Sequence, residues 1–142
     1  MKTSKLNLKM SCLLLLALLQ YGVSFAQKTS KLEVEINPVT QPKGEVYVGL
    51  FEQHNFLKEP TYGKMVKADQ QKLKVVFENI PQGEYAIAIY QDFNSNQDMD
   101  FDNSGMPLEP WAISGKEMQG MSQWEFAKFS LNKKRHKTSF KL

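Results

Sequence analysis

Residues 77–90, Phe-Glu-Asn-Ile-Pro-Gln-Gly-Glu-Tyr-Ala-Ile-Ala-Ile-Tyr, decide the fold class of this chain. Residues 84–90 are apolar at nearly every position, which is typical of a strand covered on both faces. Pro81 presets φ and Gly83 suits a tight turn, so the chain is expected to reverse there. Together these features predict a hairpin turn followed by a central strand.

Further strand patterns lie on both sides of that stretch. Residues 31–36 alternate charged and apolar side chains with period two, as a half-buried strand does. Residues 45–51 are apolar on both faces, which predicts a second central strand, and the alternation at 72–77 predicts a further strand. Residues 126–131 and 138–142 are expected to form a closing hairpin. The best helical pattern is short, from Gln53 to Lys58. The sequence therefore predicts an all-β fold: a small antiparallel β-sandwich, Ig-like or transthyretin-like, with about seven strands and little helix.

The first 26 residues have the features of an export signal. Three lysines precede an apolar run from Met10 to Leu19, and Ser24 and Ala26 fit the small-x-small rule for cleavage after Ala26. An apolar run of about ten residues is too short for a membrane core, which needs ~20; the alternative is an uncleaved anchor. We expect residues 1–26 to be a cleavable signal peptide. Residues 27–142 are then a single exported domain without a membrane span, in the periplasm or outside the cell.

Charge and cysteine content exclude two classes of function. The chain has 18 Lys and Arg against 15 Asp and Glu, and removal of the three signal lysines leaves 15 against 15. A formally neutral domain lacks the positive excess typical of nucleic-acid binding, so no nucleic-acid partner is expected. Cys12 leaves with the signal, which excludes disulfides and thiol chemistry from the mature domain.

Oxygen-bearing side chains occupy alternate positions directly after the predicted central strand. Residues 92–102 read Asp-Phe-Asn-Ser-Asn-Gln-Asp-Met-Asp-Phe-Asp, and the start matches the Asp-x-Asn-x-Asn of a calcium loop. Such a loop has Gly where this chain has Gln97, and Glu where it has Asn103. The alternative is a solvated loop whose side chains cap its own backbone. The candidate calcium ligands are Asp92, Asn94, Asn96, Asp98 and Asp100.

The same region carries a family resemblance. Residues 83–96, Asp100, the run 105–109 (Gly-Met-Pro-Leu-Glu) and residues 127–129 resemble the bacterial DUF2141 family, over nearly the whole mature chain. The resemblance implies an exported protein of unknown function with a transthyretin-like or Cna-B-like β-sandwich. Members commonly have His before the first Asp and Gly after the second Asn, where this chain has Gln91 and Gln97.

The mature sequence shows no familiar catalytic constellation. His54 and His136 lie far apart in the chain, and there is no Gly-x-Ser-x-Gly elbow, phosphate loop or dinucleotide fingerprint. Paired carboxylates for hydrolysis remain an alternative, among Asp98, Asp100, Asp102 and Glu109. We therefore expect a non-enzymatic binding or structural module of the cell envelope, with a glycan or protein partner. The alternatives are a carboxylate-dependent hydrolase and a glycan-binding accessory domain.

Two further clusters could contact a partner. Trp111 and Trp124, with Tyr47, Tyr62 and Phe101, could form a platform for a sugar or peptide. The alternative is that both tryptophans pack in the core or cover the sheet edge. Lys133-Lys134-Arg135-His136-Lys137 could touch acidic glycans or lipid headgroups, the alternative being a solvated hairpin tip.

Overall fold

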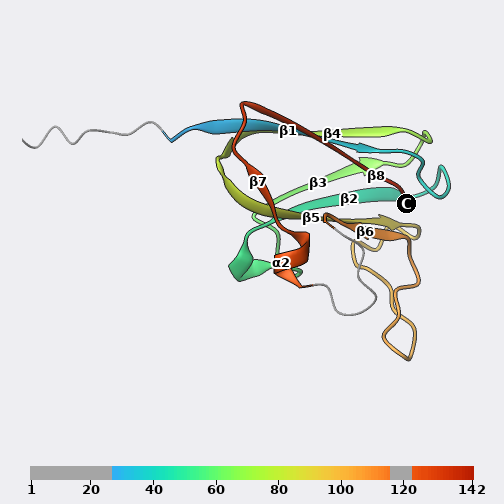
Figure 1. Ribbon diagram of the computed structural model, residues 1–142. Helices are drawn as coiled ribbons and strands as arrows, with labels where there is room; N and C mark the ends of the chain where they lie inside the picture. The colour runs from blue at the N-terminus through green and yellow to red at the C-terminus, as the bar shows by residue number, and fades with distance from the viewer. Residues whose placement is uncertain (1–26, 116–122) are drawn as a thin grey trace, which may run out of the picture.

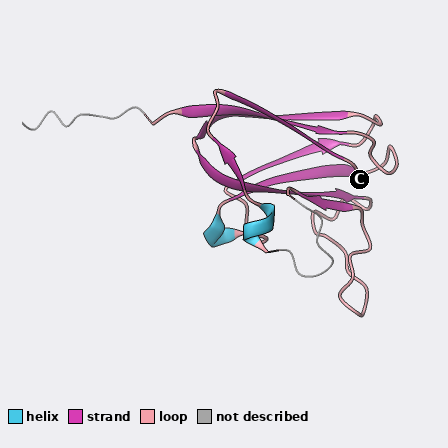
Figure 2. Cartoon of the chain, in the orientation of Figure 1, coloured by secondary structure: helices cyan, strands magenta, loops and turns pink. Residues whose placement is uncertain are grey.

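A computed structural model describes residues 27–115 and 123–142, which form two β-sheets with almost no helix (Figures 1 and 2). The predicted signal peptide lies outside the described residues. The strands are β1 (Thr29–Ile36), β2 (Glu45–Phe51), β3 (Tyr62–Lys67), β4 (Leu73–Pro81), β5 (Gly83–Asp92), β6 (Trp111–Ile113), β7 (Phe129–Leu131) and β8 (Arg135–Phe140). Among the described residues, no helix has the length and apolarity needed to cross a membrane.

One sheet has three strands in the order β4-β1-β8. β1 pairs antiparallel with β4 and parallel with β8, so that Glu33 lies opposite both Val76 and Lys137. The alternation expected for residues 31–36 is confirmed, because Leu32, Val34 and Ile36 are fully buried and the charged residues between them face outward.

The other sheet has five strands, in the order β3-β2-β5-β6, with β7 pairing with the first residues of β5. All of its pairings are antiparallel. The prediction that 45–51 and 84–90 are central strands is confirmed, since β2 and β5 lie side by side with a neighbour on their other edges.

The hydrophobic core lies between the two sheets. Every strand of the first sheet and both central strands of the second contribute apolar side chains to it. Its fully buried members are Leu32, Val34, Ile36, Val46, Val48, Leu50, Ile87 and Leu131. The predicted all-β, sandwich-like architecture is therefore confirmed.

Two predicted hairpins are wrong. The Pro81–Gly83 turn joins β4 of one sheet to β5 of the other, so it is a corner between sheets. Similarly, β7 pairs with β5 whereas β8 pairs with β1. Turn-forming residues specify a change of direction, and pairing partners are decided by which apolar face each strand must bury.

Helical structure is limited to short turns. The stretch predicted at Gln53 to Lys58 is a 3-10 turn, η1 (Gln53–Asn55), and a single helical turn, α2 (Trp124–Ala127), replaces the start of the strand expected at 126–131. β3 and β6 were not predicted. β3 is an edge strand whose side chains are mostly exposed, and β6 has only three residues, so neither shows a burial pattern in the sequence.

Candidate functional site

The loop that follows β5 is organised around the buried carboxylate of Asp92. This side chain is 2 % exposed. Its Oδ1 accepts a hydrogen bond from the backbone N–H of Ser95 at 2.6 Å and its Oδ2 accepts one from that of Gln97 at 2.8 Å. A carboxylate that accepts several backbone amides fixes the loop entry much as an N-cap fixes a helix. Ser95 and Gln97 have positive φ values, 58° and 70°, so the chain turns tightly around this point.

Three of the predicted calcium ligands meet at Asp100. Asn94 Nδ2 donates to Asp100 Oδ2 at 2.7 Å, and Asn96 Nδ2 donates to Asp100 Oδ1 at 3.0 Å. The side-chain oxygens of Asn94 and Asn96 accept backbone N–H groups of Asn96 and Asp98. These bonds are the Asx-type self-capping that the sequence offered as the alternative to calcium.

Glu109 completes this network; the sequence named it as a candidate carboxylate for hydrolysis but not as a calcium ligand. It is 6 % exposed, and its Oε1 accepts the backbone N–H of Phe93 at 2.7 Å while its Oε2 accepts that of Asp100 at 3.3 Å. One carboxylate thus ties the start of the loop to its middle. The signal for it was the Gly-x-Pro-x-Glu run, which places an acid shortly after a turn.

Asp98 and Asp102 lie outside this cluster. Only the backbone N–H of Asp98 is bonded within the loop. The Asp102 carboxylate caps a separate turn, where it accepts hydrogen bonds from Ser104 and Met106, and these bonds lower its pKa. Within the described part of the chain, no three His, Cys, Asp or Glu side chains are grouped so as to hold a metal ion. A cation in this loop would therefore require the amide oxygens of Asn94 and Asn96.

A groove with a volume of about 910 Å³ lies on the outer face of the five-stranded sheet. The strand registers place Met65, Tyr47, Tyr90 and Trp111 in one row across β3, β2, β5 and β6. The next row, formed by Gly63, Gly49, Ala88 and Ile113, is mostly small. Large rings beside small residues produce a hollow that crosses the strands.

The two glycines let aromatic rings lie against the sheet. A Cβ at Gly49 would lie 2.7 Å from Cε2 of Phe51, and a Cβ at Gly63 would lie 2.5 Å from Oη of Tyr47. Both approaches are far below van der Waals contact, so any side chain there would displace the rings. Tyr47 also packs on Tyr90, with ring centroids 5.4 Å apart. The outer face of the sheet is therefore an aromatic surface.

The acidic loop forms one wall of this groove. Tyr90 Oη donates a hydrogen bond to the carbonyl of Gln97 at 3.0 Å, and Phe101 and Pro107 also line the hollow. Burial, followed by the charge of Asp92, raises the pKa of Tyr90 to about 12, so its hydroxyl stays protonated. In Figure 1 this loop and η1 both extend from the side of the sheet that faces away from β1, β4 and β8.

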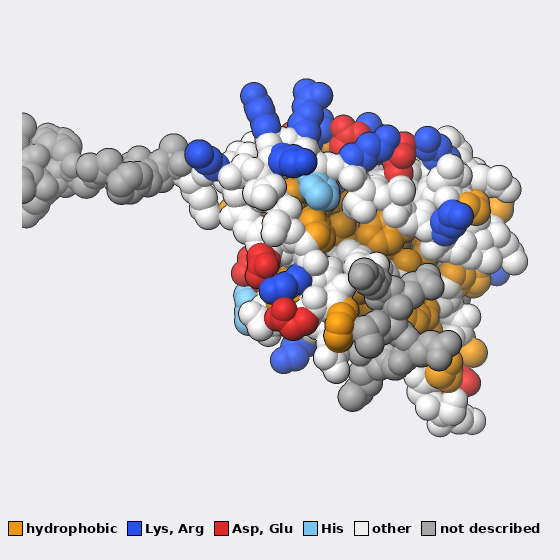
Figure 3. All heavy atoms as spheres, viewed as in Figure 1, with side chains coloured by type: hydrophobic (Ala, Val, Ile, Leu, Met, Phe, Trp, Pro, Cys, Tyr) orange, Lys and Arg blue, Asp and Glu red, His pale blue; other side chains and the backbone are white. Residues whose placement is uncertain are grey.

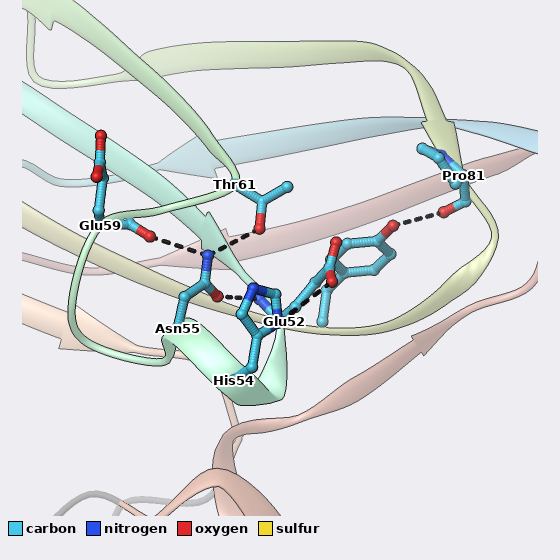
Figure 4. Close-up of polar contacts among 7 residues, drawn as sticks. Glu52, His54, Asn55, Glu59, Thr61 and Pro81 are labelled. Atoms are coloured by element: carbon cyan, nitrogen blue, oxygen red, sulfur yellow. Dashed lines mark hydrogen bonds and ion pairs between the residues drawn. The ribbon is translucent and has the colours of Figure 1, made fainter.

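Asn55 holds the opposite wall (Figure 4). Its Oδ1 accepts the backbone N–H of Glu52 at 2.8 Å, while its Nδ2 donates to the carbonyl of Glu59 and the hydroxyl of Thr61. These bonds close the segment that brings Leu57, Lys58, Glu59 and Pro60 to the groove. His54, on the same turn, has an exposed side chain 3.6 Å from Glu52.

The two tryptophans lie in different places. Trp111 is 48 % exposed and lines the groove together with Tyr47 and Phe101. Trp124 lies against Phe56, with ring centroids 5.7 Å apart, and lines a second hollow beside Glu52 and His54. Its Nε1 is buried without a hydrogen-bond partner among the described residues. The two side chains therefore do not form one platform.

Gln91, where the resemblance led us to expect His, is a structural residue. It is fully buried, and its Nε2 donates to the carbonyls of Gln41 and Lys43 at 2.6 and 2.7 Å. These bonds fix the segment between β1 and β2 against the end of β5. A buried amide that satisfies two carbonyls accounts for a polar residue at this core position.

Comparison with known proteins places the chain in a family. A family model described as an uncharacterised protein conserved in bacteria, DUF2141, matches residues 34–139. No curated protein and no solved structure matches the chain. The matched range begins within β1 and contains the groove and the whole acidic loop, and on that extent the chain belongs to the DUF2141 family.

Proposed function

We propose that this protein is an exported, non-enzymatic binding module of the cell envelope that holds a neutral glycan chain in the groove. The observation that carries the proposal is the row of three aromatic rings, with Met65 at its end, beside a row of mostly small residues. The volume of the groove, about 910 Å³, falls within the range of ligand sites, roughly 300 to 1,000 Å³. The basic start and apolar run of residues 1–26 support export to the periplasm or beyond.

The chemistry of the groove floor favours a sugar over a peptide. β2 and β5 are paired on both edges, so their backbone groups are already bonded and cannot pair with an extended peptide. A peptide laid on this apolar face would bury N–H and C=O groups without partners. A sugar ring has an apolar face that can stack on an aromatic ring, while its hydroxyls project from the ring edge.

The rim of the groove supplies polar groups for those hydroxyls. Lys58, Glu59 and Asp98 lie at its edge and carry one positive and two negative charges. Burial, together with the charge of Glu59, raises the pKa of Tyr47, so this phenol remains a donor. An acidic ligand would meet two carboxylates at the rim, which favours an uncharged one.

Trp111→Ala should weaken glycan binding by about 5- to 150-fold, because loss of one stacking ring typically costs about 1 to 3 kcal/mol. Titration calorimetry with neutral hexasaccharides of glucose, xylose and N-acetylglucosamine would measure it on the mature chain. Trp124→Ala is the matched control and should bind as the wild type does. Equal losses in the two variants, or no binding of any neutral oligosaccharide by the wild type, would contradict the groove as the site.

The same oligosaccharides also test whether the protein is an enzyme. The carboxylates of Asp92, Asp100 and Glu109 already accept hydrogen bonds from backbone or amide groups, which leaves them poorly placed to transfer protons to a substrate. Chromatography of the oligosaccharides after prolonged incubation should show no cleavage. Cleavage that disappears in Asp98→Asn would support the hydrolase instead.

We also propose that the loop wall of the groove binds calcium weakly. Asn94, Asn96 and Asp100 already converge, and rotation of each amide by half a turn would present oxygens in place of the N–H groups. Asp92, Asp98, a backbone carbonyl and water would supply further oxygens of the roughly six to eight that calcium takes. The cation would also relieve the repulsion among the clustered carboxylates.

Calcium at millimolar concentration should raise the melting temperature of the wild type relative to chelator. With a dissociation constant on the order of 10⁻⁴ to 10⁻³ M, the gain grows with concentration and reaches ~2.7 kcal/mol at ~100 times that constant, which is about 10 to 100 mM calcium. Asp100→Asn should lose this shift, because Asp100 is where the two amides meet. Asp102→Asn, which removes the same charge from a separate turn, should keep it. A shift that is absent from the wild type, or present in both variants, would show that the loop is only self-capped.

A further inference from the structure

The outer face of the three-stranded sheet carries an excess of cations. Lys31, Arg135 and Lys137 project from the parallel pair β1 and β8, Lys74 lies on β4 and Lys72 directly precedes it. Lys133 and Lys134 lie in the turn that leads into β8. We call these seven residues the basic face. In Figure 3 the Lys and Arg side chains gather along the top of the molecule, above β1 and β8.

The carboxylates on this face are already paired. Glu78 lies 2.8 Å from Lys31, Glu33 contacts Lys74, and Glu35 lies 3.1 Å from both Lys72 and Lys137. The hydrogen bonds from these lysines lower the pKa of Glu33 and Glu35, so both stay ionised. Seven cations against three carboxylates leave a net charge of +4 on the face.

The uncompensated cations lie together at one end of the face. Within residues 27–115 and 123–142, no carboxylate lies within ion-pair distance of Lys133, Lys134 or Arg135. The turn that carries them is pinned to β1, because Ser30 Oγ donates to the carbonyl of Lys133 at 2.7 Å and Lys31 N donates to that of Lys134 at 2.9 Å. The register then sets Arg135 directly opposite Lys31. The cluster is thus held in place on the sheet.

The rest of the domain has the opposite charge. The other described residues include 7 Lys and 11 Asp or Glu, a net charge of −4. Four of those acids lie in the loop that walls the groove, on the far side of the core from the basic face. A domain that is neutral as a whole is therefore strongly polarised between its two sheets.

We propose that the basic face docks on a bilayer surface that contains anionic phospholipid headgroups. The cations are spread over three adjacent strands, which suits a plane of phosphates better than a single small anion. The exposed large apolar side chains are Leu57, Met65, Phe101, Met106, Leu108, Trp111 and Phe126, and none of these belongs to the three-stranded sheet. Docking is therefore electrostatic and reversible, without insertion.

This orientation has a consequence for the groove. The two sheets pack through their inner faces, so the basic face and the groove point in opposite directions. A domain docked through the basic face presents the groove away from the membrane. The acidic loop, which a negative surface repels, would then also lie on the distal side.

Vesicle sedimentation with the mature chain tests the proposal. Vesicles of phosphatidylglycerol and phosphatidylcholine should bind the protein at low ionic strength and release it at about 1 M salt, where screening extends over only about 3 Å. Each cation near an anionic surface contributes about fivefold in affinity, so K133Q/K134Q should bind roughly 25-fold more weakly. K43Q/K67Q, which removes the same charge from exposed sites off the basic face, should bind within about twofold of the wild type.

Each of five outcomes would overturn the proposal. The first three are equal binding to vesicles of phosphatidylcholine alone, equal losses in the two double variants, and retention at high salt. The fourth is displacement by inorganic phosphate well beyond that by chloride at equal ionic strength, which would indicate a site for the free anion. Binding to heparin or duplex DNA without binding to anionic vesicles would likewise assign the face to a polyanion rather than to a membrane.

Discussion

Ile87→Ala is expected to lower the free energy of unfolding by about 2 to 5 kcal/mol. Ile87 is fully buried on β5, the strand that pairs with β2, β6 and β7. Its side chain lies between the two sheets, where neighbours held by strand pairing on every side cannot collapse into the cavity. Urea denaturation followed by tryptophan fluorescence would give the difference.

The matched control is Ile113→Ala on β6. The substitution Ile113→Ala makes the same change in volume, but Ile113 is only half-buried and lies on the outer face. Its loss should therefore lower the free energy of unfolding by about 1 kcal/mol or less. A cost below ~0.5 kcal/mol for Ile87→Ala, or equal costs for the two variants, would mean that the core does not lie where the two sheets meet.

The sequence was sufficient to predict those strands whose burial produces a recognisable pattern of apolar residues. Residues 31–36 alternate because one face is covered. Residues 45–51 and 84–90 are apolar on both faces because the core covers one face of β2 and β5, and aromatic rings and loops lie over the other. It was insufficient for the pairing partners. Pro81 and Gly83 turn the chain equally well into a hairpin or into the corner that the structure has between β4 and β5.

The candidate sites likewise contain features that could be recognised from the sequence and features that depend on the fold. The spacing of oxygens in residues 92–102 is local, so the loop could be recognised from the sequence, but the choice of Asp100 as the meeting point depends on the fold of the loop. Tyr47 and Trp111 could be named as candidate platform residues, but the aromatic row of Met65, Tyr47, Tyr90 and Trp111 could not be recognised. Its members come one from each strand and meet only through register. Glu109 likewise reaches Phe93 across 16 positions of sequence.

The position of the loop connects the two proposed sites. Gln97 lies in the loop that would hold calcium, and its carbonyl accepts the hydroxyl of Tyr90, a member of the aromatic row. A cation that orders the loop would therefore order one wall of the groove. By linkage, any factor by which calcium strengthens glycan binding must equal the factor by which the glycan strengthens calcium binding.

Asp92→Asn is expected to destabilise the fold by about 2 to 3 kcal/mol, although it changes a single oxygen to an NH₂ group. Both Asp92 oxygens accept backbone N–H groups, those of Ser95 and Asn96 on Oδ1 and that of Gln97 on Oδ2. The asparagine amide has a single oxygen, so it can accept backbone N–H groups at only one of the two positions. The NH₂ group at the other position would face a backbone donor within a site that is 2 % exposed. Hydrogen bonds to a charged group are worth about 1.5 to 3 kcal/mol, and a buried donor left without a partner adds to the loss.

Asp98→Asn separates this effect from the change in charge. It removes one negative charge from the same loop, but the side chain of Asp98 accepts none of the loop's backbone bonds, so the cost should stay within about 0.5 kcal/mol. Urea titrations in chelator, which remove any contribution from calcium, would compare the two variants with the wild type. Amide hydrogen exchange should show faster exchange at Ser95 and Gln97 in Asp92→Asn, because their N–H groups lose the acceptor that now protects them. If Asp92→Asn proves as stable as Asp98→Asn, with those amides still protected, then the buried carboxylate does not organise the loop and the wall of the groove must be held by Glu109 alone.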